Sequence, residues 1–436
     1  MHKRQLFWTS NLLLSLLAAL PSAAPPRILT LGEALDTART QQPQLRQAAA
    51  ATQASLARAD AARAALLPQV GGSVQVQRAT ANSVSRPGSG SVATATEKWD
   101  MYNSYDVGLD AGVLIYDFGQ TSNKWRSSLE SANSLRESER ASMEQVLFSV
   151  RTAFFQARAA RGFVQVASDT LTNQQKHMDQ TQAFVEAGQQ AEIALAQAKT
   201  DLANAKVQLI NAQNSYETAK ARLNQAMGAE GPANYDVADE SLESVNGEDE
   251  TMDTLLDEAI RNRPELSSLA AQVRAQELTV RAAKGAYGPS LGFSTGFTDA
   301  GDHVSDLTWN WNAALVLSIP VFKGGLTQAQ VREAEATLIS VRSQLDLARQ
   351  QVRFEVEQAL LAIRAAKAAV SASGEALVNA GERLRLAEGR YETGFGSIIE
   401  LGDAQVALTS AQQQEVQSEY NLAQARAGLL KALGRN

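Results

Sequence analysis

Residues 31–68 read LGEALDTARTQQPQLRQAAAATQASLARADAARAALLP, and residues 252–289 read MDTLLDEAIRNRPELSSLAAQVRAQELTVRAAKGAYGP. A shift of 221 positions aligns the two stretches without a gap. Among the residues that then coincide are Leu35 with Leu256, Ala38 with Ala259, Pro43 with Pro264, Leu45 with Leu266, and Pro68 with Pro289. The match predicts that the chain contains two copies of one structural unit.

The repeat continues toward the C-terminus at a different offset. A shift of 206 positions pairs Tyr116 with Phe322, Gly119 with Gly325, Val146 with Val352, Gly188 with Gly394, and Gly228 with Gly434. The change of offset places an insertion in the first half, within residues 80–98, where Ser, Gly, Thr and Ala predict a flexible surface loop. The predicted repeats span residues 25–228 and 251–436.

Composition excludes several classes of protein. The 436 residues include no cysteine, so disulfide scaffolds, thiolate metal sites and cysteine nucleophiles are ruled out. A net charge of -7 argues against nucleic acid as a partner, and a mean hydropathy of -0.23 argues against a polytopic helical membrane protein. We also expect no enzyme activity, cofactor or metal, because no phosphate-binding loop or metal-spaced carboxylate cluster is present.

The N-terminus has the three parts of a secretory signal peptide at residues 1–24. Lys3 and Arg4 precede an apolar run at residues 6–20, and small residues follow at 22–24. An uncleaved membrane anchor is the less favoured alternative, because polar residues at 9–11 interrupt the run and a helical span needs about 20 apolar residues. Export without disulfides is compatible with the periplasm or outer membrane of a Gram-negative cell.

Two strand pairs are predicted, at residues 69–116 and 290–320. Each alternates apolar residues with Gln, Asn, Ser, Gly or Asp over about ten positions, which is typical of a tilted transmembrane β-strand. The candidate aromatic girdle at the strand ends comprises Tyr102, Tyr105, Tyr116, Trp309, Trp311 and Phe322. A soluble sandwich whose polar face meets bulk water is the alternative.

Four strands cannot cross a membrane alone, because open edges in lipid leave backbone groups unpaired. Closed transmembrane barrels begin at about eight strands, so the chain would contribute its four to an oligomer. This argument predicts a shared barrel but does not fix the number of subunits.

Long helices are predicted where prolines are absent, at residues 88–231 and 321–436. Segments 121–187 and 327–393 would each extend roughly 100 Å as helix, and a heptad spacing in the second favours coiled-coil packing. In each half a second helix would run back and end near residue 227 or 433. The glycines expected to end the four helices, in the left-handed conformation, are Gly188, Gly228, Gly394 and Gly434.

Residues 229–250 join the two halves and contain no Lys or Arg. We interpret this acidic stretch as an irregular connector, with a cation site as the less favoured alternative.

On these features the chain resembles the TolC-like outer-membrane efflux protein family over almost its whole mature length. Three motifs add to the duplicated stretches: LIYDFGQ at 114–120, VFKGGLTQAQ at 321–330, and YETGFGSIIELGDAQVAL at 391–408. The resemblance implies an α+β membrane protein, a homotrimer whose 12-stranded barrel lies in the outer-membrane lipid and continues into a helical coiled-coil tunnel across the periplasm. It also implies docking on a periplasmic adaptor and an inner-membrane ABC or proton-driven transporter, for efflux or type I secretion. A coiled-coil adaptor or stalk without a channel is the rival interpretation.

The resemblance implies a gate at the periplasmic tip. Glu400 and Asp403 match acidic positions of the family and share one helix face, so copies in a trimer would form carboxylate rings. The alternative is a capping box in which Ser397 is the N-cap and Glu400 the third residue. Tyr391 is a candidate for an interhelical clasp, a contact that would lock the closed tip. Ala194 and Gly396 stand where family members have residues that could pair with it, so the hypothesis is a loosely closed resting state.

Both helix turns are candidate contacts for the adaptor. The residues assigned to these tips are Gly188, Gln189, Gly394, Phe395, Gly396 and Ser397, flanked by Lys199 and Arg390. Small residues would permit close approach of a partner hairpin, although glycines at such places are also explained by the turns alone.

Overall fold

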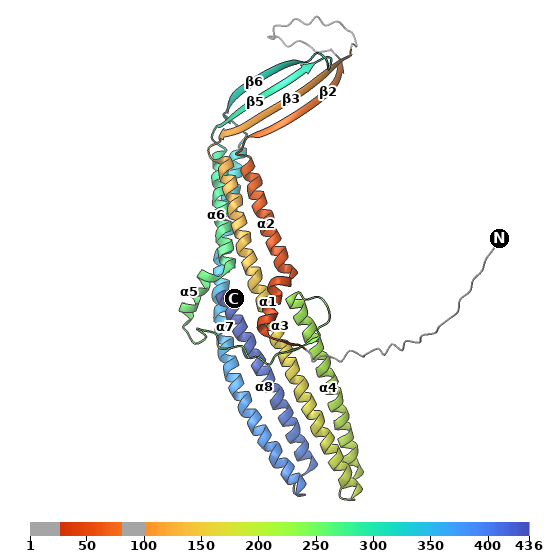
Figure 1. Cartoon of the computed structure of the whole chain (residues 1–436). Coiled ribbons are helices and arrows are strands. Elements are labelled where there is room, and N and C mark those ends of the chain that lie inside the picture. Colours follow the sequence, from red (N-terminus) through yellow and green to blue (C-terminus); the bar gives the residue numbers. More distant parts are fainter. Residues whose placement is uncertain (1–26, 81–100, 436) are drawn as a thin grey trace, which may run out of the picture.

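The computed structural model describes residues 27–80 and 101–435. The predicted signal peptide and most of the predicted loop insertion lie outside the described residues. The molecule is elongated: a curved sheet lies at one end, and long helices run from it to two helical hairpins at the other (Figure 1). Within the described ranges, no helix is both long enough and apolar enough to span a membrane.

The two halves contain elements of the same kind in the same order. Each contains an 11-residue helix, α1 (Leu31–Gln41) or α5 (Met252–Asn262), followed by a 22-residue helix, α2 (Pro43–Ala64) or α6 (Pro264–Gly285). Strand pairs follow: β2 (Gln69–Thr80) with β3 (Met101–Tyr116), and β5 (Ser290–Gly301) with β6 (Thr308–Ser318). Then come 67-residue helices, α3 (Gln120–Glu186) and α7 (Leu326–Glu392), and 36-residue helices, α4 (Glu192–Met227) and α8 (Ile398–Leu433).

The helix ends follow local chemistry. Pro43 and Pro264 each occupy the first turn of a helix, where no amide hydrogen is needed. The four glycines predicted to end helices all have positive φ, from 67° to 78°. At each one the following amide donates to a carbonyl five residues earlier, as Gln189 N does to Phe184 O at 2.8 Å. This pattern is the Schellman motif, so the expectation of left-handed glycines is confirmed at all four.

The four strands form one antiparallel sheet in the order β2-β3-β5-β6. Its register places the apolar series of each strand side by side; for example, Gly72 pairs with Leu109, Leu109 with Phe297, and Phe297 with Trp311. The register shifts between Leu114 and Tyr116, so the simple alternation predicted for β3 ends at a bulge. In the described chain β2 and β6 are the sheet edges, and neither has a further strand beside it.

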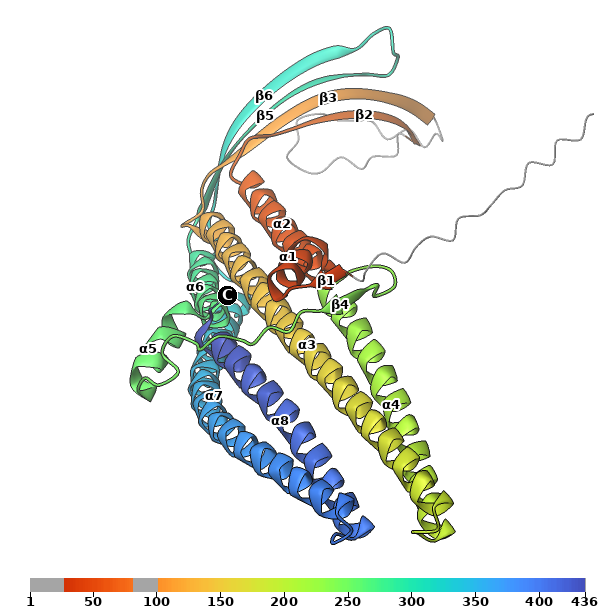
Figure 2. The same ribbon diagram turned by 60° about the horizontal axis from the view of Figure 1, so that its bottom comes forward.

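The long helices lie side by side in a fixed order. In the half near the sheet, α2 contacts α3, α3 contacts α6, and α6 contacts α7; in the far half, α4 contacts α3, α3 contacts α8, and α8 contacts α7. In two views, α7 lies on one side of the layer, and α2 and α4 lie on the other (Figures 1 and 2). The layer therefore has two open sides, as the sheet does.

The connector is more ordered than predicted. β1 (Arg27–Leu29) pairs in parallel with β4 (Tyr235–Val237), so the expectation of an irregular segment is wrong at these three residues. The acidic residues pair with basic side chains of the long helices, as Glu248 does with Arg426 at 3.1 Å and Lys367 at 2.8 Å. The connector itself needs no Lys or Arg, because the helices beneath it supply the basic side chains that pair with its acidic residues.

Candidate functional site

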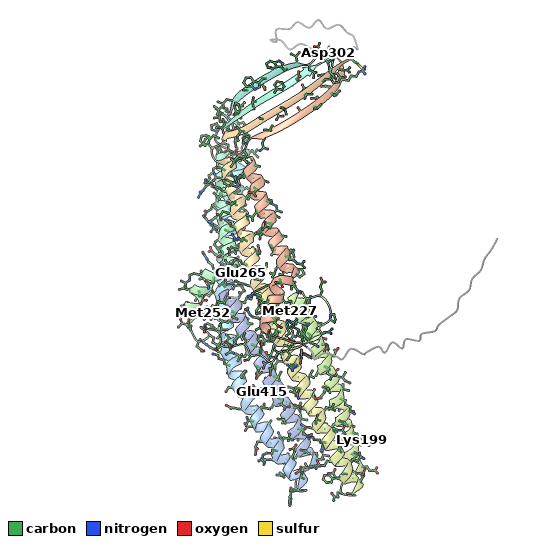
Figure 3. All side chains as sticks on the ribbon, in the orientation of Figure 1. Lys199, Met227, Met252, Glu265, Asp302 and Glu415 are labelled. Carbon is green, nitrogen blue, oxygen red and sulfur yellow. The ribbon has the colours of Figure 1, made fainter. Side chains whose placement is uncertain are left out.

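Two helix turns form the end of the molecule farthest from the sheet. Lys199, near one of these turns, and Asp302, beyond the sheet, mark opposite ends of the structure (Figure 3). Gly188 and Gly394 end α3 and α7 with φ of 73° and 78°. Among the residues assigned to these tips, the side chain of Phe395 is 84% exposed. A large apolar ring held in solvent at a turn is a feature of contact sites.

Gly396 is required by the path of the second turn. A Cβ at this position would lie 2.9 Å from Tyr391 N and 3.0 Å from both C and Cβ of Arg390. The chain therefore passes directly over the last turn of α7, where no side chain fits without a shift. Glycine fits this close approach, at the position where the resemblance led to the expectation that an arginine of a clasp is missing.

Tyr391 links the two hairpins. Its side chain is 6% exposed, and its phenol oxygen accepts a hydrogen bond from Gln190 Nε2 at 2.8 Å. Its ring also packs on His177 and Phe184 of α3, with centroid distances of 5.7 and 6.1 Å. Ala194 is the position at which the sequence predicts a missing clasp partner, whereas the observed partner, Gln190, lies four residues earlier in the turn.

Ser397 caps α8, and Glu400 has a second partner. Ser397 Oγ accepts a hydrogen bond from Glu400 N at 3.1 Å, as an N-cap does. The Glu400 carboxylate lies 3.5 Å from Arg390 Nε. Half of the capping box is therefore present, and the side chain of Glu400 pairs with the end of α7. Arg390 was named as an adaptor contact, and its pairing with Glu400 was not foreseen.

Asp403 is exposed and lines a groove of about 640 Å³ between α3, α4 and α8. Val406, at 67% exposure, and Ile399, at 71%, lie along the same groove. Glu400 and Asp403 are three residues apart in α8, so both carboxylates lie within one turn at the tip. The structure thus brings the predicted gate residues Tyr391, Glu400 and Asp403 to one end of the molecule.

The aromatic residues of the sheet lie at two levels. Trp309 and Trp311 begin β6 at the end far from the helices, and both are more than 60% exposed; Tyr105 lies near this end in β3. The ring of Trp309 stacks on Phe297 of β5, with centroids 6.2 Å apart. Tyr116 ends β3 near the helices, and Phe322 lies beyond β6 at 87% exposure. Tyr102 belongs to β3, but its side chain lies outside the described part.

Comparison with known proteins places this architecture in a class. A sequence profile of the family described as "Outer membrane efflux protein" matches residues 34–229 and 255–435. The chain belongs to this family, and it is an outer-membrane protein.

Its relatives include the pyoverdine export outer membrane protein OpmQ of Pseudomonas aeruginosa, 26% identical over 86% of this chain and 78% of the relative. The outer membrane protein TolC of Escherichia coli is 26% identical over 91% of this chain and 80% of the relative. The crystal structure of the Campylobacter jejuni CmeC outer membrane channel superposes with a TM-score of 0.83 at 18% identity, covering 93% of this chain and 85% of that one.

Proposed function

We propose that three copies of this chain form a closed exit duct through the outer membrane and periplasm. The observation that carries the proposal is the pair of open sides. β6 and α7 lie toward one side of the molecule, and β2, α2 and α4 toward the other (Figure 1). A second copy placed beside the first would pair β6 with β2 and α7 with α2 and α4, closing the sheet and the helical layer together.

The strand number is compatible with closure in a ring. Because each copy contributes four strands in alternating directions, every junction between copies is antiparallel like the strand pairs within one copy. Two copies would give an eight-stranded barrel, which is narrow enough for side chains to fill its interior. Three copies give 12 strands and leave an aqueous lumen lined by the polar series of Gln, Asn, Ser and Asp residues.

Exposed apolar side chains lie along the helices at the open sides. On α7 an exposed stripe recurs at about seven- or eight-residue intervals and comprises Ile339, Leu347, Phe354 and Leu361, with Val378 and Leu386 further along. On α4 the exposed apolar residues are Ile193, Val207 and Ile210. Such rows at coiled-coil spacing are stabilised by burial against another helix, which supports α7 packing on the α2 and α4 of a neighbour.

We further propose that the tips are the periplasmic gate. In a trimer, Glu400 and Asp403 would form rings of carboxylates that favour cations, and the Tyr391–Gln190 hydrogen bond would hold each α7/α8 hairpin against α3/α4. The exposed turns, including Gln189 and Phe395, would contact a periplasmic adaptor linked to an inner-membrane ABC or proton-driven transporter. Small molecules or unfolded polypeptides would pass outward, as in efflux or type I secretion.

Native mass spectrometry of the detergent-extracted protein tests the assembly. The proposal predicts a complex of three mature chains, and it predicts that the protein stays with the membrane pellet after sodium-carbonate extraction. A monomer released by carbonate would instead support the rival interpretation of a stalk or adaptor without a channel.

A further inference from the structure

His177 lies buried where the two hairpins meet. It belongs to α3, its side chain is 8% exposed, and its ring packs on that of Tyr391 at an interplanar angle of 62°. Thr181, one helical turn further on, is fully buried, and Phe184 follows on the same face of α3 and also contacts Tyr391. His177 is therefore part of the contact by which Tyr391 joins the α7/α8 hairpin to α3.

Three buried polar atoms around this contact have no hydrogen-bond partner among the described residues: Nδ1 of His177, Oγ1 of Thr181 and Oε1 of Gln190. Buried polar groups in folded proteins are usually paired, and leaving one unpaired costs about 1–3 kcal/mol. Separation of the hairpins would let water reach these atoms. The closed contact therefore carries a free-energy cost, and a positive charge on the His177 ring would increase that cost.

Charged and titratable groups face His177 from every element packed against it. Together with His177 they line two adjoining cavities, of about 640 and 230 Å³. These groups are Lys176 of α3, Asp201 of α4, Glu388, Tyr391 and Glu392 of α7, and Asp403 of α8. Burial lowers the pKa of the His177 imidazole below its ordinary value of 6.5, and the negative charge of Asp201 opposes that effect only in part.

We propose that His177 makes the tip contact proton-dependent: the neutral imidazole favours the closed packing of the α7/α8 hairpin on α3, and the imidazolium favours separation of the hairpins. This inference rests on the proposed function, because it assumes that the tips gate a channel.

The direction follows from linkage. In the closed tip the pKa of His177 is depressed, and in an open, hydrated tip it returns toward 6.5. The open state therefore binds more protons once the pH falls below about 6.5. Closure is fully favoured above that pH and is progressively lost as the pH falls toward the depressed pKa.

The carboxylates at the tip act in another way. Repulsion among rings of ionised Glu400 and Asp403 would favour opening whether or not His177 is protonated. Acid would promote opening through His177 as the pH falls below about 6.5.

The experiment is a pH series of single-channel recordings on the full chain in planar lipid bilayers. We expect the open probability of the wild type to rise at least about threefold between pH 7.5 and 5.5, because the open state binds the proton of His177 more tightly than the closed state. His177→Gln and His177→Phe both remove the titrating group, and the Phe variant keeps a ring against Tyr391. In both variants the open probability at pH 5.5 should be less than about twice that at pH 7.5.

The Glu230→Gln/Glu243→Gln double variant removes two exposed carboxylates of the connector, away from His177; it is the control and should keep the rise between pH 7.5 and 5.5. An undiminished rise in either His177 variant would overturn the inference and leave the proposed channel intact. If the wild type conducts but shows no rise in this window, the inference is also wrong. Absence of current from the wild type at every pH would overturn the proposed function itself, and this inference with it.

Discussion

Gln190 Nε2 donates a hydrogen bond to the phenol oxygen of Tyr391 at 2.8 Å, across 201 residues of sequence. Gln190 lies in the turn between α3 and α4, and Tyr391 in the last turn of α7, so one bond joins the two hairpins at their tips. The rings of His177 and Phe184 enclose the same tyrosine. The hypothesis of a loosely closed resting tip stays a prediction. Within one copy, the contact between the hairpins uses Gln190, and we refer to this contact as the clasp.

The clasp predicts that Tyr391→Phe eases opening. The ring stays packed on His177 while a hydrogen bond with a net contribution of about 1 kcal/mol is lost. Single-channel recording should show roughly a fivefold higher open probability, since 1.4 kcal/mol corresponds to tenfold. Tyr420→Phe, in the core far from the tip, is the control and should match the wild type. An unchanged open probability in Tyr391→Phe would show that the bond does not hold the tip closed.

The acidic residues of α8 predict cation selectivity. In Glu400→Gln/Asp403→Asn the carboxylate rings disappear without a large change of side-chain shape, so the cation preference should decrease. Reversal potentials in asymmetric KCl measure this preference. The control removes two exposed carboxylates of the connector, Glu230→Gln/Glu243→Gln, and should keep the wild-type value. Equal selectivity in both double variants would remove Glu400 and Asp403 from the gate.

The exposed stripe of α7 predicts where copies meet. Leu347 is 64% exposed in one copy and would be buried in the assembly. Leu347→Glu would place an unpaired charge in that interface at a cost of several kcal/mol, and native mass spectrometry should show at least about a tenfold loss of the three-chain species. Leu347→Met conserves volume and polarity and should assemble normally. Normal assembly of Leu347→Glu would contradict the proposed contact.

The buried carboxyl of Glu144 should make the stability of the folded protein depend on pH. Burial, with the nearby charge of Glu265, raises the pKa of this α3 carboxyl to about 7 from its ordinary 4.5. The folded state therefore binds an extra proton between these values, and stability falls as the pH rises from about 4.5 to 7.

Glu144→Gln removes this titration. The variant should be more stable than the wild type above pH 7, on the order of 3 kcal/mol per copy, and gain little at pH 4.5. Thermal unfolding at pH 4.5 and pH 8 measures the difference. The same gain at both pH values would show that ionisation of Glu144 is not the cause.

Much of the fold was accessible from the sequence, because its signals are local and periodic. Prolines at 43 and 264 and the glycines that end the long helices restrict the backbone directly, so helix limits were expected to within about a residue. The period-2 alternation identified the strands β2, β3, β5 and β6. The bulge after Leu114 and the pairing of β1 with β4 had no such signal, because each depends on a partner segment elsewhere in the chain.

The tip was only partly predictable for the same reason. Ser397 and Glu400 are three residues apart, so a cap was foreseeable and is observed. His177 belongs to a Gln-rich helical sequence and Gln190 to a turn, and both read as solvated surface. Their contact with Tyr391 arises only when the two hairpins pack together, and spacing along the chain carries no information about that contact.

The central claim is that copies of this chain enclose a continuous water-filled duct. Conductance of the purified, full-length wild-type protein in planar lipid bilayers tests it most directly. The account predicts discrete, cation-selective current steps from the fraction that contains three chains, and no such steps from the Leu347→Glu monomer. Three-chain protein that inserts in the bilayer and passes no current at any pH or voltage would contradict the claim.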